Sequence, residues 1–248
     1  MKNIGFIGGG KIGKALIAHV HEKQYANIVF VEDPVAVLEG ENVVRSKTPE
    51  LYAAVDLVIE CAMASVLKER ISDILKTADL MCFSVTAFSD PAFAQQVREL
   101  TAQYGHHVYI PHGAILGLDG IFDGRNLWRE ISIQTIKSPK SLNLDNTEKE
   151  VVYQGATRGA CGAFPRNVNV HASIAMAGLG MDQTQSMIVS YPSVSTNTHI
   201  ITLHGDGIDV TIHVSSYAQG AVTGAYTPSS ACGSLDRILD TDSPLRFV

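Results

Sequence analysis

The sequence is poor in cysteine, in basic residues and in long apolar runs. Its four cysteines lie far apart and form no C-x-x-C pair, so neither a disulfide scaffold nor a thiolate metal site is predicted. The net charge is −6 and the lysines and arginines are scattered, which argues against a broad nucleic-acid-binding surface. No apolar run approaches the ~20 residues of a membrane span. We therefore expect no nucleic-acid partner, no membrane partner and no bound metal.

What remains is the composition of an ordinary globular protein. Apolar residues make up 46% of the 248 residues and charged residues 18%. A chain of this length suits one large domain or two modest ones. The sequence opens on an apolar segment that is expected to be a buried strand, which leaves no place for a signal peptide. A cytoplasmic location is therefore the expectation.

The first thirty-three residues hold a pattern with a clear physical purpose. An apolar segment, expected to be a strand, runs into a loop that fits G-x-G-x-x-G and then into a helical stretch. Gly8 permits a tight turn, Gly10 lets backbone N–H groups approach a pyrophosphate, and Gly13 lets the helix pack close to the strand. Lys11 and Ile12 begin the helix, whose N-terminus offers N–H donors and a partial positive charge to phosphates. The pattern predicts a dinucleotide site of the Rossmann type.

An acidic residue follows the second expected strand. Glu32 lies close to the ~20-residue spacing after the third glycine at which a carboxylate accepts hydrogen bonds from an adenosine ribose. An acid here repels the 2′-phosphate of NADP, so NAD is the expected cofactor. Lys11 would soften that preference, which leaves NADP open.

Strands and helices continue to alternate up to about residue 112, with one helix expected from Thr86 to about Gln103. This alternation predicts an α/β fold with parallel βαβ units in a doubly wound sheet. Ligands of such sheets collect beyond the carboxyl ends of the strands. Cys61, Ala62 and Thr86 follow two of the expected strands. They are therefore predicted to line the nicotinamide half of the cofactor site.

The hydrophobic pattern changes to a period of two in the second half of the chain. Several strands with one helix near residues 168–178 indicate a mixed or antiparallel sheet. We predict a dinucleotide-binding domain over residues 1–112, to which residues 229–248 return. Residues 113–228 are predicted to form an α+β domain for substrate binding and dimerisation.

Several segments resemble the L-aspartate dehydrogenase family, in the same order and across most of the chain. They are GGGKIGKAL, DLVIECA, PHGAILGLDG, TIKSPKSLNLD, FPRNVNV and NTHIITL. The run FPRNVNV, followed by NTHI, is far more specific than the glycine loop. The resemblance implies NAD(P)-dependent oxidative deamination of L-aspartate to iminoaspartate, or to oxaloacetate and ammonia. It also implies a Rossmann domain, an α+β substrate domain and a homodimer.

The family's catalytic histidine falls on His199, and its cofactor contacts fall on Ala114 and Asn169. Hydride leaves Cα only from a neutral amine, and the resulting imine needs a group that takes and gives protons near neutral pH. An imidazole, with an ordinary pKa near ~6.5, suits both tasks. An Asn amide can hold the nicotinamide carboxamide or ribose, although Asn169 also suits a helix N-cap. His204 and His213, on similar strands without such a match, are interpreted as structural residues.

Aspartate carries two carboxylates, so its pocket needs cations or clustered N–H donors. Lys137 and Arg166 lie within the family-like segments and are candidates, the alternative being that each is a solvated surface charge. Two further residues are predicted to bind the substrate. They are His112, at the expected crossing between domains, and Asn197, just before the catalytic histidine.

The chain departs from the family at Tyr191 and Ser195, near which acidic residues are usual. Two alternatives therefore stay open. The first is an NAD(P)-dependent dehydrogenase or reductase of another small amino, imino or keto acid, which a substrate panel would separate. The second is a non-catalytic dinucleotide-sensing protein, which would bind NAD(H) tightly without hydride transfer.

Overall fold

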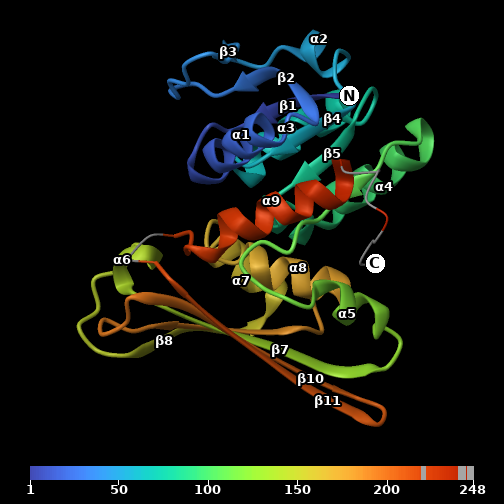
Figure 1. Cartoon of the computed structure of the whole chain (residues 1–248). Coiled ribbons are helices and arrows are strands. Elements are labelled where there is room, and N and C mark those ends of the chain that lie inside the picture. The colour runs from blue at the N-terminus through green and yellow to red at the C-terminus, as the bar shows by residue number, and fades with distance from the viewer. Residues whose placement is uncertain (219–221, 240–243, 245–248) are drawn as a thin grey trace. The chain divides into compact units, whose positions relative to one another are not determined.

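The computed structural model describes residues 1–218, 222–239 and 244 of the chain (Figure 1). The chain divides into two compact units. Unit 1 comprises Met1–Pro111 and Pro228–Val248, and unit 2 comprises His112–Thr227. The predicted return of residues 229–248 is described as far as residue 239 and at residue 244; the rest of that segment lies outside the described residues.

Unit 1 is built on a six-stranded parallel sheet in the order β3-β2-β1-β4-β5-β6. Its strands are β1 (Lys2–Ile7), β2 (Ala26–Glu32), β3 (Val43–Val44), β4 (Leu57–Glu60), β5 (Asp79–Cys82) and β6 (Val108–Tyr109). The strand order reverses between β1 and β4, so the carboxyl ends of these two strands lie side by side at a topological switch point. Doubly wound sheets bind their ligands at such a point. The predicted fold class is confirmed for this half.

The helices of unit 1 bury apolar stripes against the sheet. They are α1 (Lys11–Lys23), α2 (Pro49–Tyr52), α3 (Ala64–Ile74), the 3₁₀ helix η1 (Val85–Ser89), α4 (Pro91–Tyr104) and α9 (Tyr226–Leu239). In α1, Leu16, Ile17 and Val20 join a core cluster with residues of β1, β2 and β4. Leu235 and Leu239 of α9 belong to the same cluster, so the C-terminal helix completes the core of this unit.

One helix boundary differs from the prediction. A single helix was expected from Thr86 to about residue 103, whereas η1 ends at Ser89 and α4 begins at Pro91. The Asp90 side chain caps α4 by accepting hydrogen bonds from the backbone N–H groups of Ala92, at 3.0 Å, and Phe93, at 3.4 Å. An acidic N-cap followed by proline at the first position is a strong start signal, which divides the segment in two.

Unit 2 is built on a five-stranded mixed sheet in the order β11-β10-β7-β9-β8. Its strands are β7 (Trp128–Lys137), β8 (Glu150–Ala156), β9 (Gln185–Ser190), β10 (Thr196–Gly205) and β11 (Ile208–Tyr217). The β7–β9 pair is parallel and the other pairs are antiparallel. The predicted mixed sheet is confirmed.

The helices of unit 2 are more numerous than predicted. They are α5 (Leu118–Asp123), α6 (Pro139–Leu142), α7 (Thr157–Ala163) and α8 (Asn169–Ala177). Only α8 was expected, because the others are too short to show a helical period. Figure 1 shows α7 and α8 against one face of the sheet. Along β7 the residues on that face, Ile131, Ile133, Thr135 and Lys137, are buried and alternate with more exposed neighbours.

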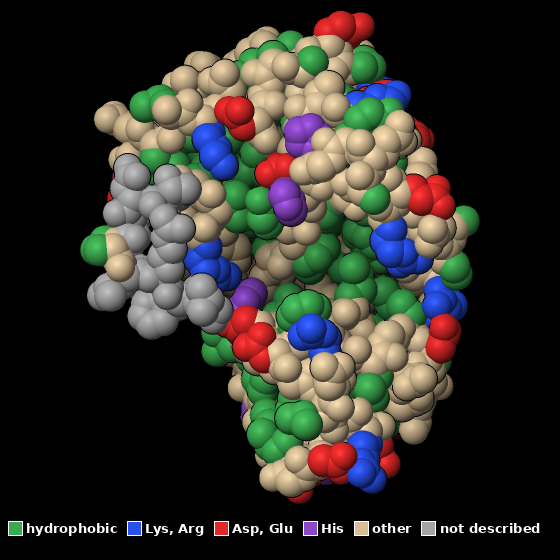
Figure 2. All heavy atoms as spheres, turned by 90° about the vertical axis from the view of Figure 1, so that its right-hand side faces the viewer, with side chains coloured by type: hydrophobic (Ala, Val, Ile, Leu, Met, Phe, Trp, Pro, Cys, Tyr) green, Lys and Arg blue, Asp and Glu red, His purple; other side chains and the backbone are tan. Residues whose placement is uncertain are grey.

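Charged side chains are dispersed over the face of the molecule that Figure 2 draws. On the face drawn in Figure 2, outside the grey atoms, lysines and arginines lie singly among acidic and apolar residues. Within the described part of the chain, no helix combines the length and the apolar character that crossing a bilayer requires.

Candidate functional site

The glycine loop between β1 and α1 is shaped by close backbone approaches. Gly8 has φ +101°, a left-handed conformation that favours glycine, and a Cβ there would lie 2.8 Å from the Cys61 carbonyl oxygen. A Cβ on Gly13 would lie 2.1 Å from the Gly8 carbonyl oxygen, so only glycine fits. A Cβ on Gly10 would meet nothing within 4 Å. The space in front of the α1 N-terminus is therefore open, as the binding of a pyrophosphate requires.

The loop is held in place by the segment that follows β4. The Cys61 thiol donates to the Gly8 carbonyl oxygen at 3.1 Å, and the Cys61 N–H donates to Ile7. Burial raises the pKa of the Cys61 thiol well above its ordinary value, so it keeps its proton and remains a donor. Lys11 and Ile12 form the first turn of α1. The predicted loop residues and Cys61 therefore come together at the switch point.

A buried carboxyl group lies at the end of β4, and it was missed in the sequence. Glu60 is fully buried and accepts hydrogen bonds from Ala62 N at 2.7 Å, Ser84 N at 3.1 Å and Ser84 Oγ at 2.7 Å. Desolvation raises the pKa of Glu60 to about 7, against the lowering effect of these hydrogen bonds. The carboxylate ties together the segments that carry Ala62 and Thr86, and Thr86 is itself buried in η1. A glutamate inside the apolar run LVIEC was the available signal.

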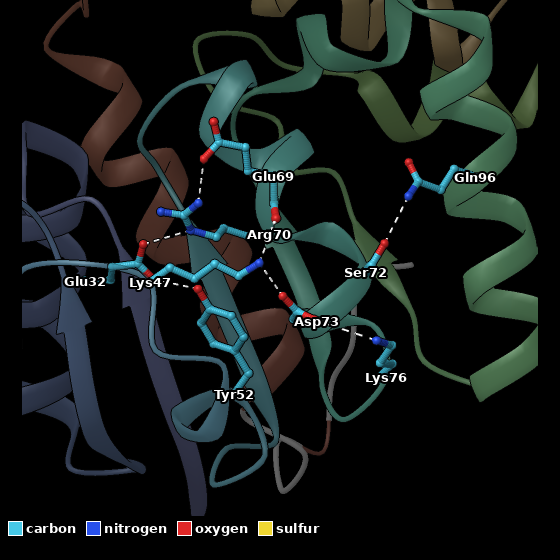
Figure 3. A network of polar contacts seen from close by, with 9 residues as sticks. All are labelled: Glu32, Lys47, Tyr52, Glu69, Arg70, Ser72, Asp73, Lys76 and Gln96. Carbon is cyan, nitrogen blue, oxygen red and sulfur yellow. Dashed lines mark hydrogen bonds and ion pairs between the residues drawn. The ribbon is translucent and has the colours of Figure 1, made fainter.

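The two acidic residues at the end of β2 have different surroundings. Glu32 is 5% exposed and accepts from Tyr52 Oη at 2.5 Å and Arg70 Nε at 3.0 Å (Figure 3). Asp33 is half-buried and accepts from the backbone N–H of Gly9 at 2.7 Å, and from two N–H groups of the next turn. These hydrogen bonds lower the pKa of Asp33 against the effect of its partial burial. The carboxylate that touches the glycine loop is therefore that of Asp33, which was not singled out as a site residue.

Glu32 belongs to a network that joins β2 to α2 and α3 (Figure 3). Arg70 also pairs with Glu69 at 2.6 Å, and Lys47 pairs with Asp73. Burial is the largest cause of a raised pKa at Tyr52, with the Glu32 carboxylate second, so the phenol stays protonated and donates. The network stabilises the packing of α2 and α3 against the end of β2, next to the glycine loop.

In unit 2, His199 lies on the helix-covered face of the sheet. It sits on β10 opposite Thr135 of β7, is 3% exposed, and its Nδ1 lies 2.8 Å from Thr135 Oγ1. Burial, followed by the nearby positive charge of Lys137, lowers the pKa of His199 to about 3. The imidazole is therefore neutral at pH 7 and able to accept a proton.

Lys137 is buried on the same face, two positions along β7 from Thr135. Its Nζ donates to Asn167 O at 3.4 Å, Asn167 Oδ1 at 3.3 Å and Val222 O at 3.3 Å, and all three acceptors are neutral. Burial lowers the pKa of Lys137 to about 8. Asn197 is also buried, and its Nδ2 donates to Val222 O at 2.9 Å. The structure thus brings Lys137 and Asn197 together, with Asn167 as a partner that the sequence did not indicate.

The remaining predicted residues of unit 2 lie in turns and at a helix start. Arg166 is exposed in the turn before α8. Asn169 is the first residue of α8 and Val168 holds the N-cap position, so the capping interpretation of Asn169 is wrong. His112 and Ala114 belong to a half-buried turn closed by Ile115 N donating to His112 O at 3.3 Å.

The two departures from the family pattern are also in loops. Tyr191 follows β9, and its ring lies under Lys149 Nζ at 5.5 Å from the ring centre. The backbone N–H of Tyr191 donates to the Lys137 carbonyl at 2.8 Å. Ser195 accepts a backbone hydrogen bond from Ala218 at 2.9 Å. Neither position supplies a carboxylate to His199.

Known proteins resemble this chain over most of its length. A family model described as "Aspartate dehydrogenase, C-terminal" matches residues 123–238, and one described as "Homoserine dehydrogenase, NAD binding domain" matches residues 8–111. The L-aspartate dehydrogenase of Methanococcoides burtonii is 31% identical over 232 residues, covering 83% of this chain and 84% of that protein. The L-aspartate dehydrogenase of Archaeoglobus fulgidus is 34% identical, covering 85% and 86%.

A solved structure agrees with these sequences. The crystal structure of aspartate dehydrogenase from Thermotoga maritima matches with a TM-score of 0.82 and 27% identity, and the match covers 100% of both chains. A mutant meso-dapdh from Clostridium tetani shares the fold at a TM-score of 0.55 and 14% identity. On the identity and coverage of these relatives, the chain belongs to the L-aspartate dehydrogenase family.

Proposed function

We propose that the protein catalyses the NAD-dependent oxidative deamination of L-aspartate to iminoaspartate, which water converts to oxaloacetate and ammonia, or the reverse amination. The observation that carries the proposal is the buried face of the unit 2 sheet. There a neutral imidazole, that of His199, and a buried ammonium, that of Lys137, occupy adjacent strands of a chain in this family.

Lys137 supplies the positive charge for a substrate carboxylate. Among the described residues it forms no ion pair, and its hydrogen-bond partners are neutral oxygens. A buried ammonium without a counter-ion is costly, and an anionic ligand offsets that cost. The adjacent Asn197 amide and the exposed guanidinium of Arg166 are the further candidates for the second carboxylate.

His199 acts on protons. Hydride leaves Cα as the amine lone pair forms the C=N bond, and the amine must first be neutral. Water then adds to the imine carbon and loses a proton, and ammonia leaves after gaining one. A neutral imidazole beside the substrate can take and return these protons. Substrate carboxylates would also raise the pKa of His199 from its low value toward neutrality, because nearby anions favour the imidazolium.

NAD binds at the glycine loop of unit 1. Gly8, Gly10 and Gly13 leave the N-terminus of α1 open to the pyrophosphate. We assign the adenosine ribose to the Asp33 carboxylate, because it contacts the loop through Gly9 N, whereas Glu32 is directed at Tyr52 and Arg70. Ala62 and Thr86 of unit 1 are proposed for the nicotinamide half, and the cofactor contacts that the resemblance implies at Ala114 and Asn169 stay predictions. This site favours NAD over NADP, and Asp33→Asn should shift the ratio of kcat/KM for the two cofactors toward NADP.

The decisive experiment follows the absorbance of reduced nicotinamide with L-aspartate, D-aspartate, L-glutamate and L-alanine in turn, with NAD and with NADP. Turnover with L-aspartate and NAD is expected, and turnover with another acid alone would overturn the substrate assignment.

His199→Ala should lower kcat at least ~10²-fold, the scale of lost acid–base catalysis, with little change in NAD affinity. Unchanged turnover in that variant would remove His199 from the reaction.

We also propose that the protein forms a homodimer through the unit 2 sheet. Helices α7 and α8 lie against one face of that sheet, while Ile136 and Ile200 on the other face are partly exposed. Light scattering coupled to size exclusion should give about twice the monomer mass. A monomer at micromolar concentration would count against it.

A further inference from the structure

A continuous series of hydrogen bonds extends from His199 into the core of unit 2. It passes through side chains of five elements, in the order His199, Thr135, His171, Ser186 and Thr157. The successive heavy-atom distances are 2.8, 2.7, 2.8 and 2.8 Å, and all five residues are buried. The last residue, Thr157, is hydrogen-bonded to a backbone carbonyl. The donor and acceptor of every hydrogen bond in the series can be worked out from that end.

The fixed end is the carbonyl oxygen of Thr184, which can only accept. Thr157 Oγ1 lies 3.0 Å from it and must donate its single proton there. Thr157 therefore has no proton left for Ser186 and has to accept from the Ser186 hydroxyl. Ser186 in turn can only accept from its other neighbour, Nδ1 of His171.

His171 is neutral, so one of its ring nitrogens donates a hydrogen bond and the other accepts one. Its ring is completely buried, and burial together with the nearby His199 and Lys137 lowers its pKa well below the ordinary value. A neutral imidazole that donates through Nδ1 has a lone pair on Nε2. Thr135 Oγ1, 2.7 Å away, therefore donates to His171 Nε2 and must accept from His199 Nδ1.

We propose that this hydrogen-bond series fixes the tautomer of His199, with the proton on Nδ1 and the lone pair on Nε2, and that Thr135 and His171 are positioning residues for the reaction. The proposal rests on the catalytic role proposed for His199. A base needs a lone pair toward the proton it removes, and the opposite tautomer would present an N–H instead. The series keeps the base in its reactive form through hydroxyl and neutral imidazole groups, with no carboxylate among its members.

The tautomer can be measured directly on the full-length protein without turnover. Two-bond ¹H–¹⁵N correlation spectra of protein labelled with ¹⁵N-histidine distinguish protonated from unprotonated ring nitrogens. The spectra of His199→Gln and His171→Gln assign the two rings. We expect Nδ1 to be protonated and Nε2 unprotonated in both residues near pH 7. Protonation of His199 at Nε2 in the wild-type protein would overturn the proposal.

A matched pair of variants tests the positioning role. Thr135→Val is nearly isosteric but removes the hydroxyl, so His199 should populate both tautomers. We expect kcat to fall by about 10- to 100-fold, the scale on which losing a residue that orients a metal-bound histidine lowers activity. The KM values for NAD and aspartate should change little. Thr135→Ser retains the hydroxyl and should restore both the spectrum and kcat. Unchanged kcat in a folded Thr135→Val protein would contradict the positioning role.

The two proposals fail in different ways. If His199→Ala retains turnover, the catalytic assignment is wrong whatever tautomer the spectrum shows. If that variant is inactive but wild-type His199 carries its proton on Nε2, the deamination proposal stands and the positioning proposal is wrong.

Discussion

Lys137 has a charge that the described residues do not balance. Lys137→Met keeps the length of the side chain and removes the charge. We expect kcat/KM for L-aspartate to fall about 10- to 150-fold, mainly through KM, because a charge-assisted contact with the substrate is worth about 1.5–3 kcal/mol. NAD affinity should be unchanged. Steady-state kinetics with varied aspartate measures this effect.

The matched control is Lys140→Met, three residues further on in α6, where the side chain is exposed. It should keep kcat/KM within about twofold, since surface substitutions usually have small effects. Equal losses in the two variants, or normal kinetics in Lys137→Met, would show that the buried ammonium does not bind the substrate.

Single residues also show where sequence reasoning reaches its limit. The motif spacing placed an acid at the end of β2, but Glu32 and Asp33 are adjacent, and side chains of adjacent strand residues point to opposite faces. The spacing cannot show which of them faces the loop. Lys137 and His199 were predicted from family-like segments. Thr135 and His171 were not, because their importance depends on the register of β7 with β10 and on how α8 packs.

At the scale of elements, Gly13 and Gly10 at the junction of β1 and α1 are expected to be glycines for different reasons. Gly13→Ala should place a methyl group 2.1 Å from the Gly8 carbonyl oxygen, so the loop or the helix must move. We expect a loss of about 1–3 kcal/mol in the free energy of unfolding, as for other overpacked sites, together with weaker NAD binding. Gly10→Ala meets no atom within 4 Å and should leave stability within about 0.5 kcal/mol.

Gly10→Ala should nevertheless weaken NAD binding, because its methyl group would occupy space that the pyrophosphate needs. Denaturant unfolding without NAD and calorimetric titration with NAD give the two quantities. If Gly10→Ala binds NAD as the wild type does, the phosphates do not lie against this part of the loop.

The strands were easier to predict than the short helices. Period-two alternation of the sequence predicted the five strands of unit 2, and in β7 and β10 it corresponds to buried residues that alternate with more exposed ones. Helices α5, α6 and α7 have six, four and seven residues, which is too few for a helical period to stand out. The break between η1 and α4 was missed although Asp90-Pro91 is a start signal, because the apolar residues on both sides fit one longer helix.

At the scale of the whole molecule, the buried Glu60 of unit 1 should make the free energy of unfolding depend on pH. Its pKa is about 7 in the folded protein, against 4.5 for an ordinary glutamate. Between these values the unfolded chain has lost the proton while the folded protein keeps it. The contribution of Glu60 to stability is therefore fully present below about pH 4.5 and is lost as the pH rises to about 7, by at most on the order of 3 kcal/mol.

Glu60→Gln approximates the protonated carboxyl group and cannot ionise. Denaturant unfolding of both proteins from pH 4.5 to 8 should show the stability difference changing in favour of the variant as the pH rises. The amide nitrogen of glutamine cannot accept the hydrogen bond that one of the two Glu60 oxygens takes from Ala62 or Ser84, so the variant is expected to be about 1 kcal/mol less stable at low pH. The test is therefore the slope of the difference with pH. A difference independent of pH would mean that Glu60 ionises in the folded protein as readily as in the unfolded chain.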